Sequence, residues 1–289
     1  MRRIVAFDVG GTKIKHGLLE EDGAILLKGS CDTPSNDLEK LLAEMEQTVQ
    51  MYTENGQVDG IAVSLPGLIY PDTGFVEHAG AVTALHRQNL KNLLQPRVNL
   101  PVVIENDGNC AAIAEKMSGN ATVCSDFICI TIGTGIGGGM FVGGKLHRGS
   151  SNGAGEFGYM IVQGDLWNAN GSTSALIQAY KEMKGISEEE YVSGETIFLE
   201  AEKDLAVRKV VDGWVKTVSY GIVNLAAVVN PEKMLLGGGI MSQPGLLSKI
   251  VKQLQRIPWW REICVPVEGC KHQNDAGMIG AVYSFLQKK

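Results

Sequence analysis

Near its start, the sequence places a carboxylate, two glycines and two donor side chains within six residues, from Asp8 to Lys13. The backbone of Gly10 and Gly11 can approach a phosphate closely, with its N–H groups pointing at the ligand. Thr12 and Lys13 would add donors, and Asp8 could hold Mg²⁺ directly or through water. An ordinary hairpin turn with a polar tip explains the same residues, so both interpretations stay open at this point.

A second segment, residues 133–139, contains five glycines among seven residues, which is more than a turn requires. This density favours close approach of the backbone to a ligand. The spacing also matches the dinucleotide fingerprint G-x-G-x-x-G, but that fingerprint must open a helix, whereas the residues that follow are typical of a strand and a turn. The predicted phosphate-binding residues of this segment are Gly133, Thr134, Gly135, Gly137 and Gly138.

A third glycine cluster, residues 237–239, follows a short apolar run. By itself it indicates only a turn. In the wall of a cleft, however, it would let the adenosine of a nucleotide lie flat against the backbone. Gly237 and Gly238 are therefore predicted to bind nucleotide.

Glu105, Asn106 and Asp107 end an apolar strand-like run and precede a predicted helix. Asp107 could cap that helix through its carboxylate. Alternatively, it could face a cleft and accept the proton of a substrate hydroxyl. Phosphoryl transfer demands little covalent chemistry of a protein, so one positioned carboxylate, a metal ion and phosphate-binding backbone would suffice. The two phosphate-type turns favour this second interpretation.

Residues 153–159, Gly-Ala-Gly-Glu-Phe-Gly-Tyr, surround Glu156 with small residues. That setting favours a carboxylate that grips the hydroxyl groups of a sugar over one that extends into solvent. Tyr159 could stack on a sugar or hydrogen-bond to it, or it could belong to the core with its hydroxyl satisfied.

These segments need strands and helices to position them, and both halves of the chain show the same order of patterns: three strands, then helix, strand, helix, strand, helix. Each half places a glycine-rich turn between its first two strands. We therefore expect an α/β protein made of two copies of one unit, with a cleft between them. The expected domains are residues 1–119, residues 120–275, and a closing helix at about 276–289 that could pack back on the first domain.

The composition narrows the class of protein further. The chain has 289 residues, of which 44% are hydrophobic, and a formal charge of −6 without long runs of either sign. Nothing in it is typical of nucleic-acid binding or of a membrane protein. The apolar run at residues 4–7 is too short for a signal peptide, and the six cysteines form no CxxC, so we expect a cytoplasmic protein.

Taken in order along the chain, these motifs resemble the ROK family of sugar kinases, within the actin, hexokinase and Hsp70 superfamily. DVGGTK and TIGTGIGGG resemble the family's two phosphate motifs, IENDGN its catalytic segment, GAGEFG its sugar loop and LGGGI its adenosine motif. The resemblance implies duplicated ribonuclease H-like domains of the actin-like ATPase type. It also implies ATP, Mg²⁺ and a sugar in the cleft between them, and commonly a homodimer.

The resemblance also implies roles for individual residues. Asp107 would be the catalytic base and would touch the sugar, and Asn106 and Glu156 would bind the sugar. Gly67 would belong to a wall of the sugar pocket, and Asp8 would lie near the Mg²⁺ of the nucleotide.

Two departures from the family's pattern stand out. Tyr159 occupies the place where many members carry His, and residues 164–174 contain no cysteine, whereas those members follow the His with cysteines that bind structural zinc. We therefore expect no zinc. The strings GEFGYM and NDAGMIGAVY most resemble a zinc-free branch that includes β-glucoside kinases and proteins proposed as N-acetylmannosamine kinases.

The leading hypothesis is an ATP-dependent kinase that phosphorylates a glucose-like sugar or a β-glucoside, with the 6-hydroxyl as the expected acceptor. N-acetylmannosamine kinase and glucokinase are alternatives within the same class. The family also contains repressors with a helix-turn-helix domain in front, for which we expect no room before Asp8. A sugar sensor without catalysis is the other alternative, and the intact Asp107 and phosphate turns argue against it.

Overall fold

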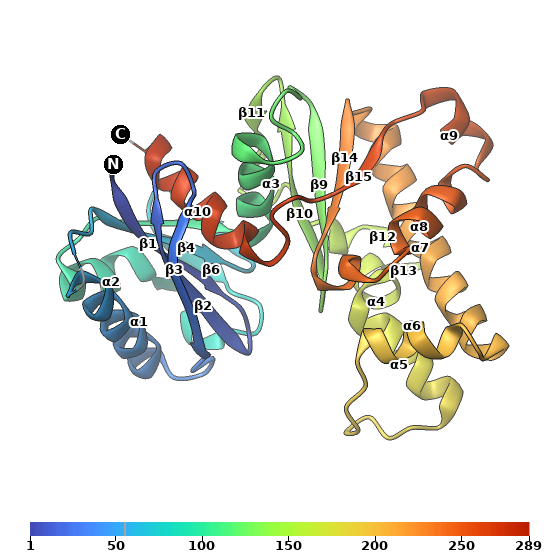
Figure 1. The fold of residues 1–289 in the computed structure, drawn as a ribbon, viewed down its shortest axis with the longest axis horizontal. Coiled ribbons are helices and arrows are strands. Elements are labelled where there is room, and N and C mark those ends of the chain that lie inside the picture. The colour runs from blue at the N-terminus through green and yellow to red at the C-terminus, as the bar shows by residue number, and fades with distance from the viewer. Residues whose placement is uncertain (55, 289) are drawn as a thin grey trace. The chain divides into compact units, whose positions relative to one another are not determined.

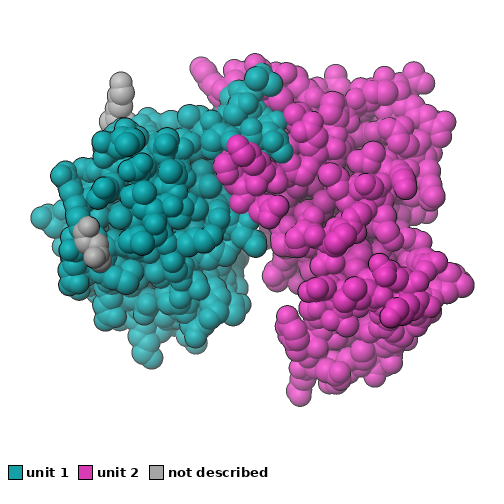
Figure 2. All heavy atoms as spheres, viewed as in Figure 1, with its two compact units in different colours: residues 1–123, 146–155, 274–289 teal, residues 124–145, 156–273 magenta. Residues whose placement is uncertain are grey.

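The computed structural model describes residues 1–54 and 56–288. The chain forms two compact units, drawn in two colours in Figure 2. Unit 1 comprises residues 1–123, 146–155 and 274–289, and unit 2 comprises residues 124–145 and 156–273. Residues 120–123, 146–155 and 274–275, which the sequence analysis assigned to the second domain, belong to unit 1.

Unit 1 holds the N-terminal strands and the C-terminal helix (Figure 1). Its elements are β1 (Arg3–Val9), β2 (Lys13–Glu20), β3 (Ile25–Asp32), α1 (Leu38–Thr53), β4 (Gly60–Leu65), β5 (Leu68–Tyr70), β6 (Phe75–His78), η1 (Thr83–Leu85), β7 (Gln88–Asn89), α2 (Leu90–Val98), β8 (Val102–Asn106), α3 (Asp107–Ser118) and α10 (Ala276–Gln287), which η4 (Gln273–Asp275) precedes. The main sheet has the order β3-β2-β1-β4-β8, and a smaller one the order β5-β6-β7.

Unit 2 is built on a second five-stranded sheet, with the order β11-β10-β9-β14-β15. Its elements are β9 (Phe127–Ile132), β10 (Ile136–Val142), β11 (Lys145–Leu146), η2 (Phe157–Tyr159), β12 (Ile161–Val162), β13 (Asp165–Leu166), α4 (Trp167–Gly171), α5 (Thr173–Lys184), α6 (Gly194–Ala201), α7 (Leu205–Val229), β14 (Lys233–Gly237), η3 (Gly239–Ser242), α8 (Leu246–Leu254), α9 (Pro258–Ile263) and β15 (Val267–Gly269).

The two main sheets follow one plan. In unit 1, β1 pairs antiparallel with β2 and parallel with β4, which pairs parallel with β8. In unit 2, β9 pairs antiparallel with β10 and parallel with β14, which pairs parallel with β15. A glycine-rich turn joins the antiparallel pair in each unit, at residues 10–12 and at residues 133–135. The predicted α/β class is confirmed.

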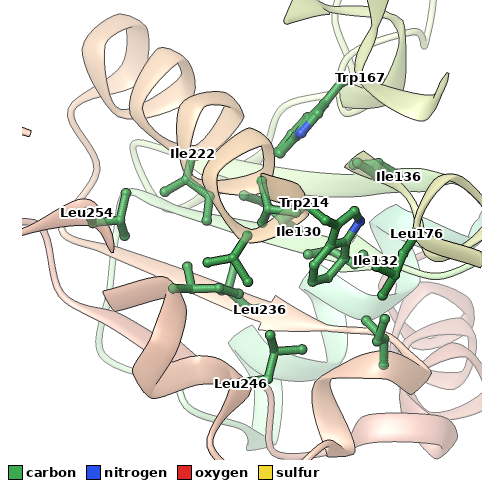
Figure 3. Close-up of a cluster of buried hydrophobic side chains, with 14 of the residues drawn as sticks. Ile130, Ile132, Ile136, Trp167, Leu176, Trp214, Ile222, Leu236, Leu246 and Leu254 are labelled. Atoms are coloured by element: carbon green, nitrogen blue, oxygen red, sulfur yellow. The ribbon is translucent and has the colours of Figure 1, made fainter. Parts of the chain in front are cut away.

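The long helix α7 supports the core of unit 2 (Figure 3). Its buried apolar residues recur every three or four positions, as an amphipathic helix requires, and include Val207, Val211, Trp214, Val218 and Ile222. They pack with residues of β9, β14, α5 and α8 in one cluster. The indole Nε1 of Trp214 donates to the backbone oxygen of Ser172 at 2.9 Å, which ties α7 to the start of α5. No described helix is long and apolar enough to cross a membrane.

The structure between residues 66 and 101 has little local signal in the sequence. Three short strands and α2 lie there. Strands of two to four residues are too short to show a period, and Pro96 lies inside α2, where proline normally ends a helix. Asn89 nevertheless caps α2, because its side chain accepts a hydrogen bond from Asn92 N.

In unit 1, α10 packs closely against α3. A Cβ added at Gly280 of α10 would lie 1.9 Å from the backbone oxygen of Cys110 in α3. The two helices therefore meet at backbone distance, and glycine is required at the contact.

We predict that Gly280→Ala lowers the free energy of unfolding by roughly 1–3 kcal/mol, the usual cost of overpacking. Gly213→Ala in α7 is the matched control, because a Cβ there meets nothing within 4 Å and alanine favours helix. Urea unfolding followed by circular dichroism measures both. Equal midpoints for the two variants would contradict the close helix contact.

Candidate active site

Three polar side chains line up across the main sheet of unit 1. In the register of the parallel strands, Asp8 on β1 lies beside Ser64 on β4, and Ser64 lies beside Glu105 on β8. All three stand near the carboxyl ends of their strands, the edge at which α/β sheets bind ligands. The fold therefore presents two carboxylates and a hydroxyl at one edge of this sheet.

Asp8 is held by contacts from three elements. Its Oδ1 accepts a hydrogen bond from Ser64 Oγ at 2.9 Å, and its Oδ2 pairs with Lys15 Nζ at 3.3 Å. Gly277 in the first turn of α10 leaves room for the carboxylate, because a Cβ there would lie 2.4 Å from Asp8 Oδ1. The sequence analysis missed Lys15 and Gly277. The hairpin register, in which Asp8 and Lys15 are opposite, could have identified Lys15.

The first glycine-rich turn is closed by a hydrogen bond from Gly10 N to Lys13 O at 2.9 Å. Thr12 and Lys13 are exposed. Lys13 Nζ pairs with Asp32 at 2.7 Å, and the hydrogen bond to this carboxylate raises the pKa of Lys13. A phosphate at this turn would compete with Asp32 for the ammonium group.

A loop at residues 78–81 packs against both Gly11 and Gly67. Gly67 has a φ of +91°, and a Cβ there would lie 2.2 Å from the backbone oxygen of His78, so only glycine fits. A Cβ at Gly11 would lie 2.7 Å from the Cβ of Ala81. The first phosphate turn and the predicted wall of the sugar pocket thus pack against the same loop. The sequence analysis gave this loop no role.

Asn106 and Asp107 form the start of α3. Asn106 is the N-cap: its Oδ1 accepts from Asn109 N at 2.9 Å, and its Nδ2 donates to Gly67 O at 2.9 Å. The capping role considered for Asp107 therefore belongs to Asn106. Asp107 is the first helical residue, is exposed, and accepts a hydrogen bond from Gly108 N at 2.8 Å. Its carboxylate lies at the surface of unit 1, next to the residue that holds Gly67.

The buried side chain of Glu105 holds the start of α3 in place. Its side chain is 1% exposed, and its Oε2 accepts from Arg148 Nε at 3.1 Å and from Arg148 Nη2 at 2.6 Å. Its Oε1 accepts from Asn106 N at 3.0 Å and from Asn109 Nδ2 at 3.1 Å. One buried carboxylate thereby fixes both the start of α3 and the segment at residues 146–155. The sequence analysis gave neither Glu105 nor Arg148 a role.

In unit 2, one pocket is lined by the second phosphate turn, through Gly133 and Thr134, and by Gly239 of the third glycine cluster, whereas the predicted Gly237 and Gly238 are not in its lining. Gly238 has a φ of +93°, and a Cβ there would lie 2.1 Å from the backbone oxygen of Ile132 at the end of β9. The adjoining cavity of about 280 Å³ is near the lower end of the roughly 300–1,000 Å³ of small-molecule sites, so it suits part of a nucleotide. Its walls include Gly133, Thr134, Thr173, Ser174, Gly239 and Ile240.

The glycines of residues 133–139 serve two different purposes. Gly137 and Gly138 lie inside β10, and a Cβ at Gly138 would lie 2.0 Å from the backbone oxygen of Cys129, so packing alone requires glycine there. Thr134 and Gly135 are exposed at the turn. The part of this segment that a ligand can reach is therefore the turn. Gly237 is buried at the end of β14, where a Cβ would lie 2.9 Å from the Sγ of Cys270.

Asn168 joins the predicted sugar loop to the second phosphate turn. Its Oδ1 accepts from Ile136 N at 2.6 Å, and a Cβ at Gly158 would lie 2.2 Å from the same oxygen. Glu156 of this loop is half-buried, and burial raises the pKa of its carboxyl. Tyr159 is 62% exposed, so the interpretation of this residue as a core side chain is wrong.

The residues present fit a nucleotide and Mg²⁺. Thr173 Oγ1 is buried in the wall of the unit 2 pocket and has no hydrogen-bond partner among the described residues, whereas buried hydroxyls are normally paired. Asp8 offers the carboxylate that Mg²⁺ uses together with substrate phosphates. Within residues 1–54 and 56–288, no group of three or more His, Cys, Asp or Glu side chains could hold a metal ion, and the expected absence of zinc stays a prediction.

The sequence profile of the ROK family matches residues 4–288, and the chain belongs to this family, as predicted. A β-glucoside kinase of Listeria monocytogenes is 38% identical, over 99% of this chain and 98% of that protein. A Listeria monocytogenes protein proposed to be an N-acetylmannosamine kinase has a structure with a TM-score of 0.90 at 37% identity, over 99% of each chain.

A third relative was solved with ligands. The ROK glucokinase of Streptomyces griseus, in complex with glucose and AMPPNP, has a TM-score of 0.84 at 28% identity, over 97% of this chain and 98% of that chain. These similarities confirm the predicted actin-like ATPase fold.

We predict that Glu156→Gln stabilises the free protein at neutral pH. Because burial raises the pKa of Glu156 above its ordinary value of 4.5, the folded state prefers the protonated carboxyl. The stability from protonation is present below about pH 4.5 and is lost as pH rises through the raised pKa. The variant's Tm should therefore exceed that of wild type at pH 7, and the difference should vanish near pH 4.5.

Differential scanning calorimetry between those two pH values measures the effect, with Glu262→Gln at an exposed position as control. A Tm difference that does not change with pH would exclude the titration of Glu156 as its cause.

Proposed function

We propose that this chain transfers the γ-phosphoryl group of ATP to a hydroxyl group of a sugar. The observation that carries the proposal is the pocket of unit 2, which Gly133 and Thr134 of the second turn and Gly239 of the third glycine cluster line together. Thr173 lines it too, and its hydroxyl has no hydrogen-bond partner among the described residues. Glycine backbone and a lone hydroxyl suit the ribose and phosphates of a nucleotide. The names of the relatives, β-glucoside kinase and glucokinase, support a sugar as the acceptor.

In this proposal, Asp107 takes the proton of the attacking hydroxyl. Its position as the first residue of α3 leaves the carboxylate exposed, while Asn106 performs the capping. The hydrogen bond from Gly108 N, at 2.8 Å, orients the carboxylate of Asp107. A general base must lie within hydrogen-bond reach of the proton it removes, so this placement suits the role.

Asp8 is the residue proposed to hold Mg²⁺, which neutralises charge on the phosphates during transfer. Ser64 and Lys15 fix its two oxygens, so the carboxylate needs little reorganisation to act. The backbone of Gly10 and Gly11 in unit 1, and of Gly133 and Gly135 in unit 2, would contact the phosphates.

The proposed acceptor is the 6-hydroxyl of a glucose-like ring, and a β-glucoside is the preferred substrate class. Glu156 would accept hydrogen bonds from the sugar, and the exposed ring of Tyr159 would leave space for an aglycone. Glucose and N-acetylmannosamine are the alternatives that the relatives' names suggest. A cytoplasmic location and a homodimer stay predictions.

A substrate panel tests the proposal. ADP release from Mg-ATP would be followed with cellobiose, gentiobiose, an aryl β-glucoside, glucose, mannose, fructose, N-acetylmannosamine and N-acetylglucosamine. We expect turnover with β-glucosides above that with the free monosaccharides. Binding of sugar and ATP without turnover on any acceptor would contradict the kinase and favour a sensor.

We predict that Asp107→Asn lowers kcat by about 10²-fold or more, the usual contribution of a general base, while sugar binding is retained. Asp72→Asn is the control, because it removes the same charge at a side chain that is 98% exposed in the same unit. Steady-state kinetics and sugar titration by calorimetry measure the two properties. A kcat within threefold of wild type would remove Asp107 from the role of base.

A further inference from the structure

A hollow of about 370 Å³ lies between α7 and the region of α8 in unit 2. Four cationic side chains line it, and Asp212 is its one acidic residue. The cations are Lys216 of α7, Lys249 and Lys252 of α8, and Arg256 just after α8. The hollow is therefore locally positive, although the formal charge of the whole chain is −6.

These four cations are not neutralised within the described part of the chain. None of them forms an ion pair there, whereas Lys184 of α5 pairs with both Glu200 and Asp204. Lys249, Lys252 and Arg256 follow one another at intervals of three and four residues, which places them on one face of α8 and its extension. Like charges at these intervals repel one another and destabilise a helix. The arrangement therefore works against the stability of unit 2.

The same hollow contains a second feature that destabilises unit 2, a glycine inside a helix. Gly213 lies inside α7, where glycine is among the least favourable residues of a helix. Packing does not require it, because a Cβ at Gly213 would meet nothing within 4 Å. The missing side chain widens the hollow. A ligand that needs both the charge and the space would explain both the cluster of cations and the glycine.

We propose that this hollow binds a compact polyphosphate anion, that is, two or more linked phosphate groups. The residues from Lys249 to Arg256 span about 10 Å along a helix axis, which is longer than a single phosphate group. Lys216 approaches from the facing helix, so a chain of phosphates could contact cations on both walls. Lysine and arginine are the side chains that bind phosphate oxygens through charge-assisted hydrogen bonds.

The hollow is separate from the nucleotide pocket, because the two share no lining residue. A third hollow connects their surroundings, since it includes Gln243 of the nucleotide pocket and Lys249 of the cationic hollow. The helix α8 also follows directly after η3, whose residues Gly239 and Ile240 line the nucleotide pocket. The proposed anion site is therefore distinct from the kinase function, and it lies near the nucleotide pocket.

Calorimetric titration of the full chain with inorganic tripolyphosphate, in Mg²⁺-free buffer, tests the proposal. We expect the double variant Lys249→Glu, Lys252→Glu to weaken binding by about tenfold or more. The control Lys145→Glu, Lys203→Glu makes the same change of charge at exposed positions of unit 2 outside the hollow, and should change binding by less than about threefold. Equal losses in the two double variants would overturn the site as non-specific attraction.

The variant Gly213→Leu tests whether binding needs the space in the hollow, independently of its charge. It fills the hollow without changing any charge, so it should weaken tripolyphosphate binding while the Tm stays equal or rises. Unchanged binding would overturn the site.

Three further titrations identify the ligand and its place. Sulfate at equal ionic strength should bind at least tenfold more weakly than tripolyphosphate. Saturating ADP should leave tripolyphosphate binding intact, whereas full competition would mean that the anion occupies the nucleotide pocket and would overturn the separate site. Tighter binding of an oligoglutamate of equal charge would overturn phosphate in favour of an acidic protein segment.

Discussion

The buried carboxylate of Glu105 is the constraint on which the acceptor side of the site depends. A charge removed from water must be paired and fully hydrogen-bonded, and both oxygens of Glu105 meet this demand. One oxygen fixes the backbone and side chain at the start of α3, where Asp107 is exposed. The other holds Arg148 and hence the ten residues that unit 1 takes from the middle of the chain. The exposed carboxylate of Asp107, which is the base in our proposal, therefore stands on a helix start that the buried Glu105 holds in place.

The two units share one order of strands but carry different side chains at the carboxyl ends of those strands. At the sheet edge of unit 1, the corresponding positions are polar: Asp8, Ser64 and Glu105 lie side by side. In unit 2, Thr131 on β9 and Gly237 on β14 occupy the matching ends. Carboxylates suit a metal ion and a proton, whereas glycine backbone and hydroxyl groups suit the nucleotide. In our proposal the division of chemistry follows this difference in side chains.

Much of the fold could be predicted from sequence, because long periodic segments and glycine-rich turns are local signals. The helix α7 (Leu205–Val229) and both hairpins with their turns are examples. The residues of the site could be named from motifs, but their supports could not. Glu105 and Arg148 are 43 residues apart, and Gly277 contacts Asp8 across most of the chain. Such contacts have no local pattern, and the short strands at residues 68–89 have too few residues to show one.

The division of the chain has a consequence for its synthesis. The polypeptide passes between the units four times, at residues 123–124, 145–146, 155–156 and 273–274. Domains generally fold as their residues leave the ribosome. Here unit 1 emerges first, yet it lacks α10, the helix that packs on β1, β4 and α3, until all of unit 2 has been made. Unit 2 can therefore close before unit 1 does, and the nascent protein must keep an apolar sheet face uncovered for most of its translation.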